Sequence, residues 1–268
     1  MMPERLHSVQ VVPKGITMIK RSVAAIPSPP RRGTVKYARW VAEHCSAGDK
    51  VLNIGAGRNL SGALDPILHR DCFIVGIDPD DTVHENETLH ERYQQSMEDF
   101  AEDHAGEFDL AFSVYVLEHV SQPESFVAAC ARVLQPGGKL FALTMNKYQY
   151  FGFITWAATR VGVSEWLLAK VKDRQRIEAY HFPTEYRLNS IPRLTRMLDD
   201  AGFDSVEFRC FDAPRTYQSY LPSRSRGVSN LYTKVVYASR LPWLMGHISF
   251  CAVRGGATTP ATPPPDGR

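Results

Sequence analysis

Short apolar runs alternate with helical patterns over most of the chain. Apolar runs bounded by polar or glycine positions predict strands at residues 50–54, 72–77, 93–95, 108–113, 139–144, 203–211 and 248–253. Apolar positions at helical spacing predict helices at residues 34–44, 124–134 and 191–201. Alternation of this kind is typical of a parallel sheet that helices cover on both faces. The predicted fold class is therefore α/β, with a sheet of seven strands.

The two ends and two long connections depart from this alternation. Prolines near the start break any helix there, so residues 1–33 are expected to be an N-terminal extension outside the fold. Residues 255–268 contain Gly, Thr, Ala and Pro without an apolar pattern and predict a disordered tail. Residues 34–254 then form one domain, and its long connections at 146–189 and 212–246 predict a cap over a substrate. Extra packing helices are the alternative for both connections.

Composition and charge argue against several classes of protein. Of the 268 residues 44% are hydrophobic, and 31 Lys and Arg against 29 Asp and Glu give a net charge of +2. This balance argues against a nucleic-acid-binding protein, which usually shows a strong basic bias. Five scattered cysteines suggest neither a disulfide framework nor a zinc site, so a cytoplasmic location is expected. No apolar stretch has the length of a spanning helix, so no stable membrane insertion is predicted; surface contact through residues 148–156 stays an alternative.

A glycine-rich turn follows the first predicted strand. Residues 51–59 read Val-Leu-Asn-Ile-Gly-Ala-Gly-Arg-Asn, and glycines there let the backbone turn sharply and approach a ligand closely. Asp78 closes the next strand about twenty residues later, where an acidic side chain in this topology accepts hydrogen bonds from ribose hydroxyls. The pair predicts a ligand that contains a nucleoside. Leu60 stands where the dinucleotide fingerprint has its third glycine, so a nicotinamide or flavin cofactor is disfavoured.

Two further segments complete a family pattern. Residues 108–120 (Phe-Asp-Leu-Ala-Phe-Ser-Val-Tyr-Val-Leu-Glu-His-Val) and 134–140 (Leu-Gln-Pro-Gly-Gly-Lys-Leu), in order with the glycine turn and Asp78, resemble the class I S-adenosylmethionine-dependent methyltransferases, in particular their type 11-like members. The resemblance covers residues 34–144, and more loosely 182–189 and the last two strands. It implies a Rossmann-like sheet and S-adenosylmethionine as cofactor. Asn59 stands where the family often has a third glycine, and Asn tolerates the left-handed backbone.

The resemblance implies where the parts of the cofactor bind. The methionine part would lie against the glycine turn, the ribose on Asp78, the adenine near the loops that follow the second and third strands, and the sulfonium beside Ser113 and Tyr115. The implied cofactor-binding residues are Asn53, Gly55, Ala56, Gly57, Asp78, Pro79, Ser96, Met97, Glu98 and Ser113.

The catalytic residues are predicted at the end of the fourth strand of the pattern. Methyl transfer is an in-line displacement, for which the protein aligns the nucleophile and removes its proton. His119 is the favoured base, with Glu118 and Tyr115 beside it; a turn-capping role is the alternative for His119. The Glu118-His119 pair is similar to that of ubiquinone-pathway O-methyltransferases, where an acidic residue three positions earlier helps it hold a divalent ion. Tyr115 stands there, which weakens but does not remove a Mg²⁺ site on Glu118 and His119 and disfavours catechol-like acceptors.

The acceptor is predicted from the long connections. Aromatic faces with Arg and Tyr donors suit sugars or an anionic polyprenyl-linked head group. The predicted substrate contacts are His181, Tyr186, Arg187 and Tyr217, with helix anchoring as the alternative for Tyr186 and Arg187. The extended C-terminal half resembles bacterial methyltransferases of polysaccharide or glycolipid assembly, which implies O-methylation of a sugar hydroxyl, as in a methylated mannose or glucose polymer. A small lipid, polyketide or isoprenoid acceptor is the second reading. A cofactor-binding partner protein without catalysis is a third, and the pattern does not predict an oligomeric state.

Overall fold

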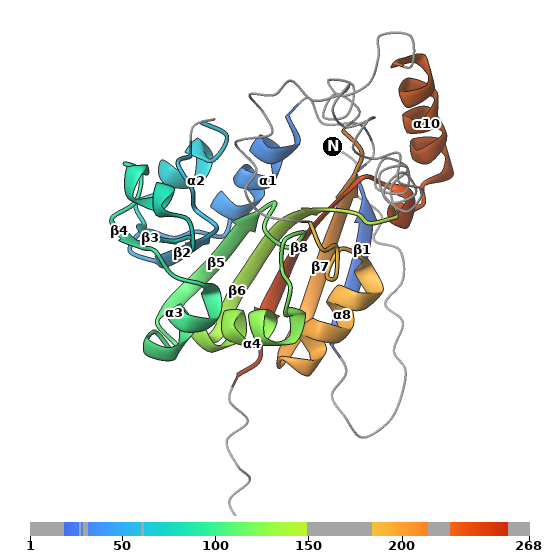
Figure 1. The fold of residues 1–268 in the computed structure, drawn as a ribbon. Helices are drawn as coiled ribbons and strands as arrows, with labels where there is room; N and C mark the ends of the chain where they lie inside the picture. Colours follow the sequence, from blue (N-terminus) through green and yellow to red (C-terminus); the bar gives the residue numbers. More distant parts are fainter. Residues whose placement is uncertain are drawn as a thin grey trace, which may run out of the picture.

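The chain folds around one twisted sheet (Figure 1). The computed structural model describes residues 19–26, 28, 32–59, 62–148, 184–213 and 226–256. The sheet has eight strands in the order β1-β7-β8-β6-β5-β2-β3-β4. Neighbouring strands are parallel, except that β8 runs antiparallel to both β6 and β7. The strands are β1 (Lys20–Ala25), β2 (Lys50–Ile54), β3 (Phe73–Ile77), β4 (Glu91–Tyr93), β5 (Phe108–Val114), β6 (Leu134–Met145), β7 (Phe203–Phe211) and β8 (His247–Arg254).

The predicted α/β class and Rossmann-like sheet are confirmed, and the seven predicted strands are all present. The largest shift is at β6, which starts at Leu134 instead of residue 139. Leu134 pairs with Phe108 and the register then shifts, so that the Pro-Gly-Gly turn at 136–138 bulges from the strand. A Cβ at Gly138 would lie 2.8 Å from the backbone oxygen of Gln135, so this turn requires glycine.

The eighth strand, β1, corrects the prediction that residues 1–33 lie outside the fold. Lys20–Ala25 forms an edge strand that pairs in parallel with β7 over its whole length. The two residues that flank β1 are also held in place: the Ile26 N–H donates to the Cys210 oxygen at 2.8 Å, and the Ile19 N–H donates to Asp199 Oδ1 at 3.0 Å. The segment has no clear alternation of apolar and polar residues, so only the open edge of β7 makes it a strand.

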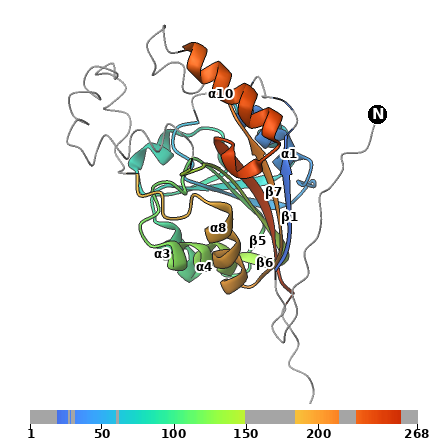
Figure 2. The same ribbon diagram turned by 90° about the vertical axis from the view of Figure 1, so that its right-hand side faces the viewer.

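Helices cover both faces of the sheet (Figure 2). They are α1 (Gly33–Ala42), α2 (Asp65–Leu68), α3 (Met97–Asp103), α4 (Pro123–Val133), α8 (Ile191–Asp200) and α10 (Arg226–Ser239), with 3₁₀ turns η1 (Asp81–Glu85) and η3 (Pro242–Leu244). The predicted helices correspond to α1, α4 and α8. Pro123 begins α4 at a position where the missing N–H breaks no helical hydrogen bond.

Each face of the sheet has its own hydrophobic core. On one face α3, α4 and α8 pack over alternate strand residues such as Leu52, and on the other α1 and α2 pack over the intervening ones such as Val51. Strands buried on both faces read as continuous apolar runs, which is the pattern seen in β2, β3 and β5. The two cores together hold the carboxyl ends of these three strands in fixed positions.

The two predicted cap segments lie largely outside the described residues. Of residues 146–189 the structure describes 146–148 and 184–189, and of residues 212–246 it describes 212–213 and 226–246. The assignment of cap and tail therefore stays a prediction. Among the helices of the described ranges, none combines the length and the apolar composition that crossing a bilayer requires.

Candidate functional site

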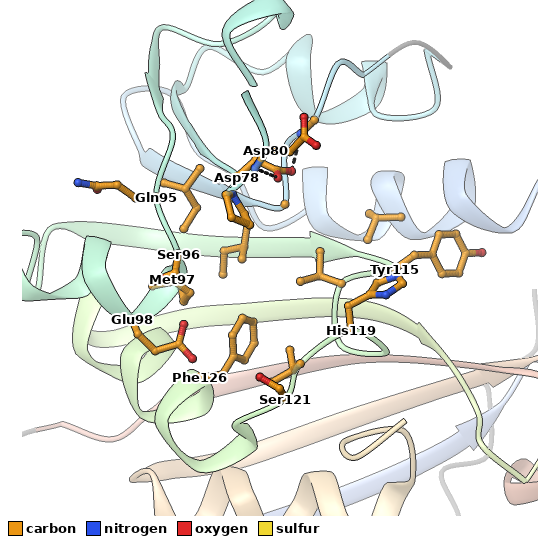
Figure 3. A pocket seen from close by; sticks show the side chains of 18 of the residues that line it. Asp78, Asp80, Gln95, Ser96, Met97, Glu98, Tyr115, His119, Ser121 and Phe126 are labelled. Carbon is orange, nitrogen blue, oxygen red and sulfur yellow. Dashed lines mark hydrogen bonds between the residues drawn. The ribbon is translucent and has the colours of Figure 1, made fainter. Parts of the chain in front are cut away.

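A cleft of about 560 Å³ opens at the carboxyl ends of the central strands (Figure 3). In open α/β sheets, ligands bind outside the carboxyl ends of the strands, where connections leave in opposite directions. The cleft lies where the chain leaves β2, β3 and β5. The predicted site residues that line it are Gly55, Gly57, Asp78, Pro79, Ser96, Met97, Glu98, Tyr115 and His119.

The glycine turn after β2 forms one wall of the cleft. Gly55 has φ = 70° and Gly57 has φ = 42°, both in the left-handed region that favours glycine. A Cβ at Gly55 would lie 2.3 Å from Cγ2 of Val116, so the backbone there is in close contact with the loop that follows β5. Asn59 follows with φ = 50°, consistent with its predicted tolerance of this conformation.

Asp78 lies at the tip of β3, facing the glycine turn. Its Oδ2 accepts a hydrogen bond from the Gly57 N–H at 3.0 Å, and its Oδ1 accepts one from the Asp80 N–H at 2.9 Å. Partial burial raises the pKa of the Asp78 carboxyl, and the two backbone hydrogen bonds oppose that rise. These contacts hold the Asp78 carboxylate at the cleft, the place where the family resemblance implies an acidic residue that binds ribose.

The start of α3 forms the opposite wall. The Ser96 side chain caps the helix by accepting a hydrogen bond from the Asp99 N–H at 3.1 Å. Met97 lines the cleft and also belongs to the core, with 4% of its surface exposed. Glu98 lies at the rim, and its Oε1 accepts a hydrogen bond from Ser125 Oγ at 3.4 Å. Met97 therefore belongs both to the cleft wall and to the core.

Tyr115 and His119 come from the loop after β5. Tyr115 has φ = 57°, an uncommon backbone conformation for a bulky residue and one that concentrates at functional sites. Its N–H donates to the Leu143 oxygen at 2.8 Å, and its ring meets the buried His247 ring edge-on at 6.0 Å. The His119 N–H closes a turn on the Val116 oxygen at 2.9 Å while its side chain lines the cleft. Figure 3 shows the two side chains close together at one end of the cleft.

Glu118, predicted to act beside His119, lies in the core instead. It is 3% exposed, does not line the cleft, and its Oε2 accepts a hydrogen bond from Thr144 Oγ1 at 2.8 Å. Thr144 Oγ1 in turn accepts a hydrogen bond from Asn189 Nδ2 at 2.6 Å. Burial raises the pKa of the Glu118 carboxyl to about 7, against the lowering effect of the Thr144 hydrogen bond. The turn after β5 thus directs adjacent residues to opposite sides, which corrects the prediction of a Glu118-His119 pair in the site.

The same turn connects Glu118 to the segment before α8. The Glu118 backbone oxygen accepts hydrogen bonds from the N–H groups of Glu185 and Tyr186, at 2.7 and 3.1 Å. Together with the Thr144 and Asn189 side chains, these contacts attach residues 184–189 to the loop that carries His119. The structure assigns Glu118 to the support of that loop.

A divalent ion on Glu118 and His119 does not fit this arrangement. The Glu118 carboxylate is used in the core, and Tyr115 offers a phenol where hard cations prefer a carboxylate. Across the described ranges, no group of three or more His, Cys, Asp and Glu side chains is placed to share one metal ion. No metal-binding role is therefore assigned to Glu118 and His119.

Three predicted cofactor residues lie beside the cleft without lining it. Asn53 and Ser113 are buried at the ends of β2 and β5, and the Ser113 oxygen accepts a hydrogen bond from Tyr37 at 3.0 Å. Ala56 is 6% exposed, and its N–H donates to the Ile77 oxygen at 3.0 Å. These three residues shape the strand ends behind the cleft wall.

The predicted substrate contacts are not brought together in the described structure. Tyr186 has φ = 51° and does not line the cleft, and exposed Arg187 pairs with Glu185 at 2.9 Å. His181 and Tyr217 lie outside the described residues, so their roles stay predictions.

Several cleft residues were absent from the sequence prediction. Asp80 and Thr82 follow Asp78 in the same loop. The acidic residues at 78, 80 and 81 are a signal in the sequence from which this part of the cleft could have been predicted. Gln95, Ser121 and the apolar residues of the cleft carried no such signal, because only the packing of α3 and α4 beside β5 brings them to it.

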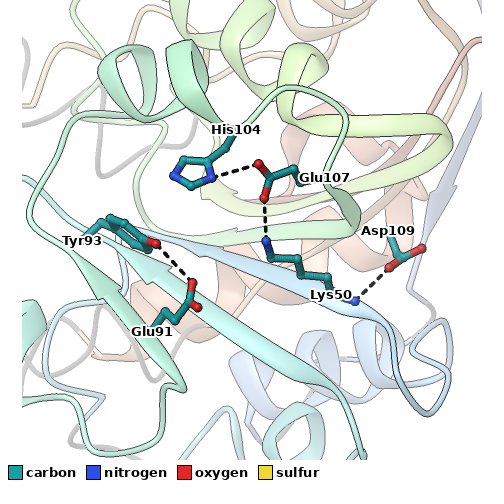
Figure 4. A network of polar contacts seen from close by, with 6 residues as sticks. All are labelled: Lys50, Glu91, Tyr93, His104, Glu107 and Asp109. Atoms are coloured by element: carbon teal, nitrogen blue, oxygen red, sulfur yellow. Dashed lines mark hydrogen bonds and ion pairs between the residues drawn. The ribbon is translucent and has the colours of Figure 1, made fainter.

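A second polar network lies at the opposite end of the sheet (Figure 4). Lys50, the first residue of β2, pairs through Nζ with Glu107 Oε2 at 2.5 Å, and its N–H donates to Asp109 Oδ2 at 2.8 Å. His104 Nδ1 lies 3.2 Å from the other oxygen of Glu107. The Lys50 hydrogen bond is the main cause that lowers the pKa of the Glu107 carboxyl. These residues lie at or just before the first residues of β2 and β5, and none of them lines the cleft.

Known proteins resemble the chain in sequence pattern and in fold. A methyltransferase domain family has a sequence profile that matches residues 31–207. The crystal structure of an S-adenosylmethionine-dependent methyltransferase from Archaeoglobus fulgidus has a similar fold, with a TM-score of 0.54 over 82% of this chain and 92% of that chain. The sequence identity is 14%, so this likeness concerns the fold alone.

Curated relatives cover a shorter part of the chain. A protein of Aromatoleum aromaticum is 34% identical in an alignment of 117 positions that covers 40% of this chain and 49% of that protein. A protein of Erwinia tasmaniensis is 32% identical over 143 residues, or 49% and 56% of the two chains. Both are named ubiquinone biosynthesis O-methyltransferase, and this chain spans about half their length. They contradict the predicted methylation of a sugar or polysaccharide hydroxyl, which was wrong because it rested on the least specific part of the pattern.

Proposed function

Because the chain belongs to the methyltransferase domain family of S-adenosylmethionine-dependent enzymes, we propose that it transfers a methyl group to a hydroxyl of a quinone-related acceptor. The observation that carries this proposal is the joint placement of the glycine turn and the Asp78 carboxylate on one cleft. Fold alone does not give a reaction, whereas this pair of groups has a defined ligand chemistry.

The residues of the cleft suit S-adenosylmethionine. The Asp78 carboxylate can accept hydrogen bonds from two ribose hydroxyls, and the turn at Gly55 and Gly57 leaves space that any Cβ would reduce. Met97 and Phe126 give the cleft an apolar surface near Glu98, as a flat purine ring requires. When bound, the cofactor supplies a methyl group on a positively charged sulfur, so the acceptor oxygen needs alignment and the loss of its proton.

His119 is the proposed base. An imidazole can take a proton near neutral pH, and among the predicted catalytic residues His119 and Tyr115 line the cleft while Glu118 does not. Tyr115 lies beside His119, and its aromatic ring suits the ring of a quinone-related acceptor. The two long connections, at 146–189 and 212–246, are proposed to cover the acceptor.

Cofactor binding is tested by calorimetry with S-adenosylhomocysteine. Replacement of Asp78 by Asn should weaken binding roughly 10- to 100-fold, the range expected for hydrogen bonds to a charged group. The matched control is Asp81→Asn, which removes a charge from an exposed residue of η1 that does not line the cleft. Absence of binding by the folded wild-type chain, or equal losses in both variants, would refute the assignment of the cleft.

Methyl transfer is tested with labelled cofactor and a short-chain prenylated catechol, with a sugar polymer as the comparison acceptor. Label is expected in the catechol, which replaces the expectation, based on Tyr115, that catechol-like acceptors are disfavoured. His119→Ala should lower kcat by roughly 10²- to 10⁴-fold and leave the Kd for S-adenosylhomocysteine within about twofold. Binding of the cofactor without label in any catechol or hydroquinone acceptor would leave the family assignment standing and overturn the acceptor.

A further inference from the structure

The chain around α10 has a charge distribution that the cleft does not explain. None of the 29 Asp and Glu residues lies within residues 213–246, whereas five of the 31 Lys and Arg residues do. The net charge of +2 for the whole chain therefore arises from this tract, and the remainder is net negative. Lys234 and Arg240 are exposed, and neither takes part in an ion pair among the described residues.

Large exposed apolar side chains lie near these basic residues in the sequence. Leu231, Val235 and Trp243 are 63%, 56% and 55% exposed, and they make up most of the large exposed apolar side chains of the described residues. Leu231 and Val235 are four residues apart on α10, so they share one face with Lys234 between them. Residues 231–243 thus expose Trp, aliphatic and basic side chains, a combination typical of segments that lie in the headgroup region of a membrane.

The orientation of α10 is set by polar contacts on its inner side. Thr233 is 6% exposed, and its Oγ1 donates to Asp212 Oδ2 at 2.6 Å. The Tyr237 hydroxyl donates to the Asp212 oxygen at 3.0 Å and accepts from the Asp212 N–H at 2.9 Å. The helix thus turns Thr233 and the core residue Val236 inward and leaves Leu231 and Val235 exposed on its outer side. Rotation that would bury Leu231 and Val235 would break these three hydrogen bonds.

We propose that the α10 face, made of Leu231, Lys234, Val235, Ala238, Arg240 and Trp243, binds the surface of an anionic phospholipid bilayer. Each basic side chain is attracted by anionic headgroups, and the three large apolar side chains can enter the boundary of the acyl chains. A second copy of the chain fits poorly, because a two-fold contact would bring the basic side chains of both copies together without a carboxylate between them. An acidic protein would complement the positive charge of this face, but it would not account for the exposed apolar side chains.

The position of α10 would bring a bound bilayer close to the cleft. Asp212 directly follows β7, and the carboxyl end of β7 lies at the same end of the sheet as the cleft (Figure 1). A bilayer at the α10 face would therefore be near the end of the sheet where ligands enter. The binding itself does not depend on methyl transfer, so it can be tested separately from the proposed function.

The test is sedimentation of the full chain with vesicles. Binding is expected to vesicles of 30% phosphatidylglycerol in phosphatidylcholine and not to phosphatidylcholine alone. The double variant Lys234→Gln with Arg240→Gln should bind roughly 30-fold more weakly, equivalent to about 2 kcal/mol for two basic side chains. The intrinsic tryptophan emission should shift to the blue with vesicles, and Trp243→Phe should lose the shift while it still sediments with them.

The matched control is Lys20→Gln with Arg21→Gln. It removes the same charge from exposed residues at the start of β1, which lies at the opposite end of the sheet. Equal losses of binding in the two double variants, no binding to anionic vesicles, or no emission shift would each overturn the proposal. Retention on immobilised poly-glutamate without vesicle binding would assign the face to an acidic protein and overturn it as well. Far-ultraviolet circular dichroism confirms that each variant is folded.

Discussion

Replacement of Glu118 by Gln tests whether this carboxyl lies in the core. The folded structure raises the pKa of Glu118 from 4.5 to about 7 through burial. Between these two values the folded state binds more protons at this group than the unfolded state does, so the stability that depends on Glu118 falls as pH rises. The loss is small at pH 5 and reaches about 3 kcal/mol at pH 8, above both pKa values. Gln keeps an acceptor for Thr144 and has no charge to bury.

The expected result is a pH-dependent difference between the two proteins. Relative to wild type, Glu118→Gln should become more stable by roughly 2 kcal/mol between pH 5 and pH 8. Urea unfolding followed by circular dichroism at both pH values gives this difference, and comparison with wild type at each pH cancels all other titrating groups. Glu43→Gln is the control, because Glu43 is exposed at the end of α1 and its replacement should give no such dependence.

A pH-independent difference between pH 5 and pH 8 would refute the reasoning, since it would show that the Glu118 carboxyl has the same pKa in the folded and unfolded states. A variant that loses stability as pH rises would refute it more strongly, because it would assign a favourable partner to the carboxylate. Either result would reopen the prediction that Glu118 acts in the cleft beside His119.

Two other replacements test the packing and the electrostatics. Gly55 and Gly106 both have φ = 70°, but of the two only Gly55 has a neighbour that an added Cβ would meet, at 2.3 Å from Val116. Gly55→Ala should therefore destabilise the chain by roughly 1–3 kcal/mol more than Gly106→Ala in urea unfolding. It should also weaken binding of S-adenosylhomocysteine. Equal costs would mean that backbone strain alone matters. Glu107→Gln should cost about 0.5 kcal/mol at pH 7, because its pair with Lys50 is about one-third exposed and screened. Since the folded pKa of Glu107 is lowered, its contribution is present above pH 4.5 and lost as pH falls through that lowered pKa, so a cost that persists in acid would contradict the pairing.

Much of the fold follows from local physical chemistry that is legible in the chain. Strands β2, β3 and β5 are apolar runs because both their faces are covered, and the glycine turn with Asp78 is recognisable because close backbone approach admits few other residues. These features depend on neighbours within a few residues, so their prediction needed no knowledge of distant contacts. The family and the cleft wall followed from them.

Other features depend on groups that are distant in sequence. Lys20–Ala25 is a strand because the edge of β7 offers it hydrogen bonds, and its own side chains gave no sign of this. Glu118 and His119 are adjacent, and both are titratable. Contacts with Thr144 and Asn189 nevertheless hold Glu118 in the core, whereas His119 lines the cleft. The outward face of α10 is likewise set by Asp212, which lies 21 and 25 residues before its partners Thr233 and Tyr237. Hydrogen bonds between remote residues carry no local periodicity, so their effects became visible in the folded chain alone.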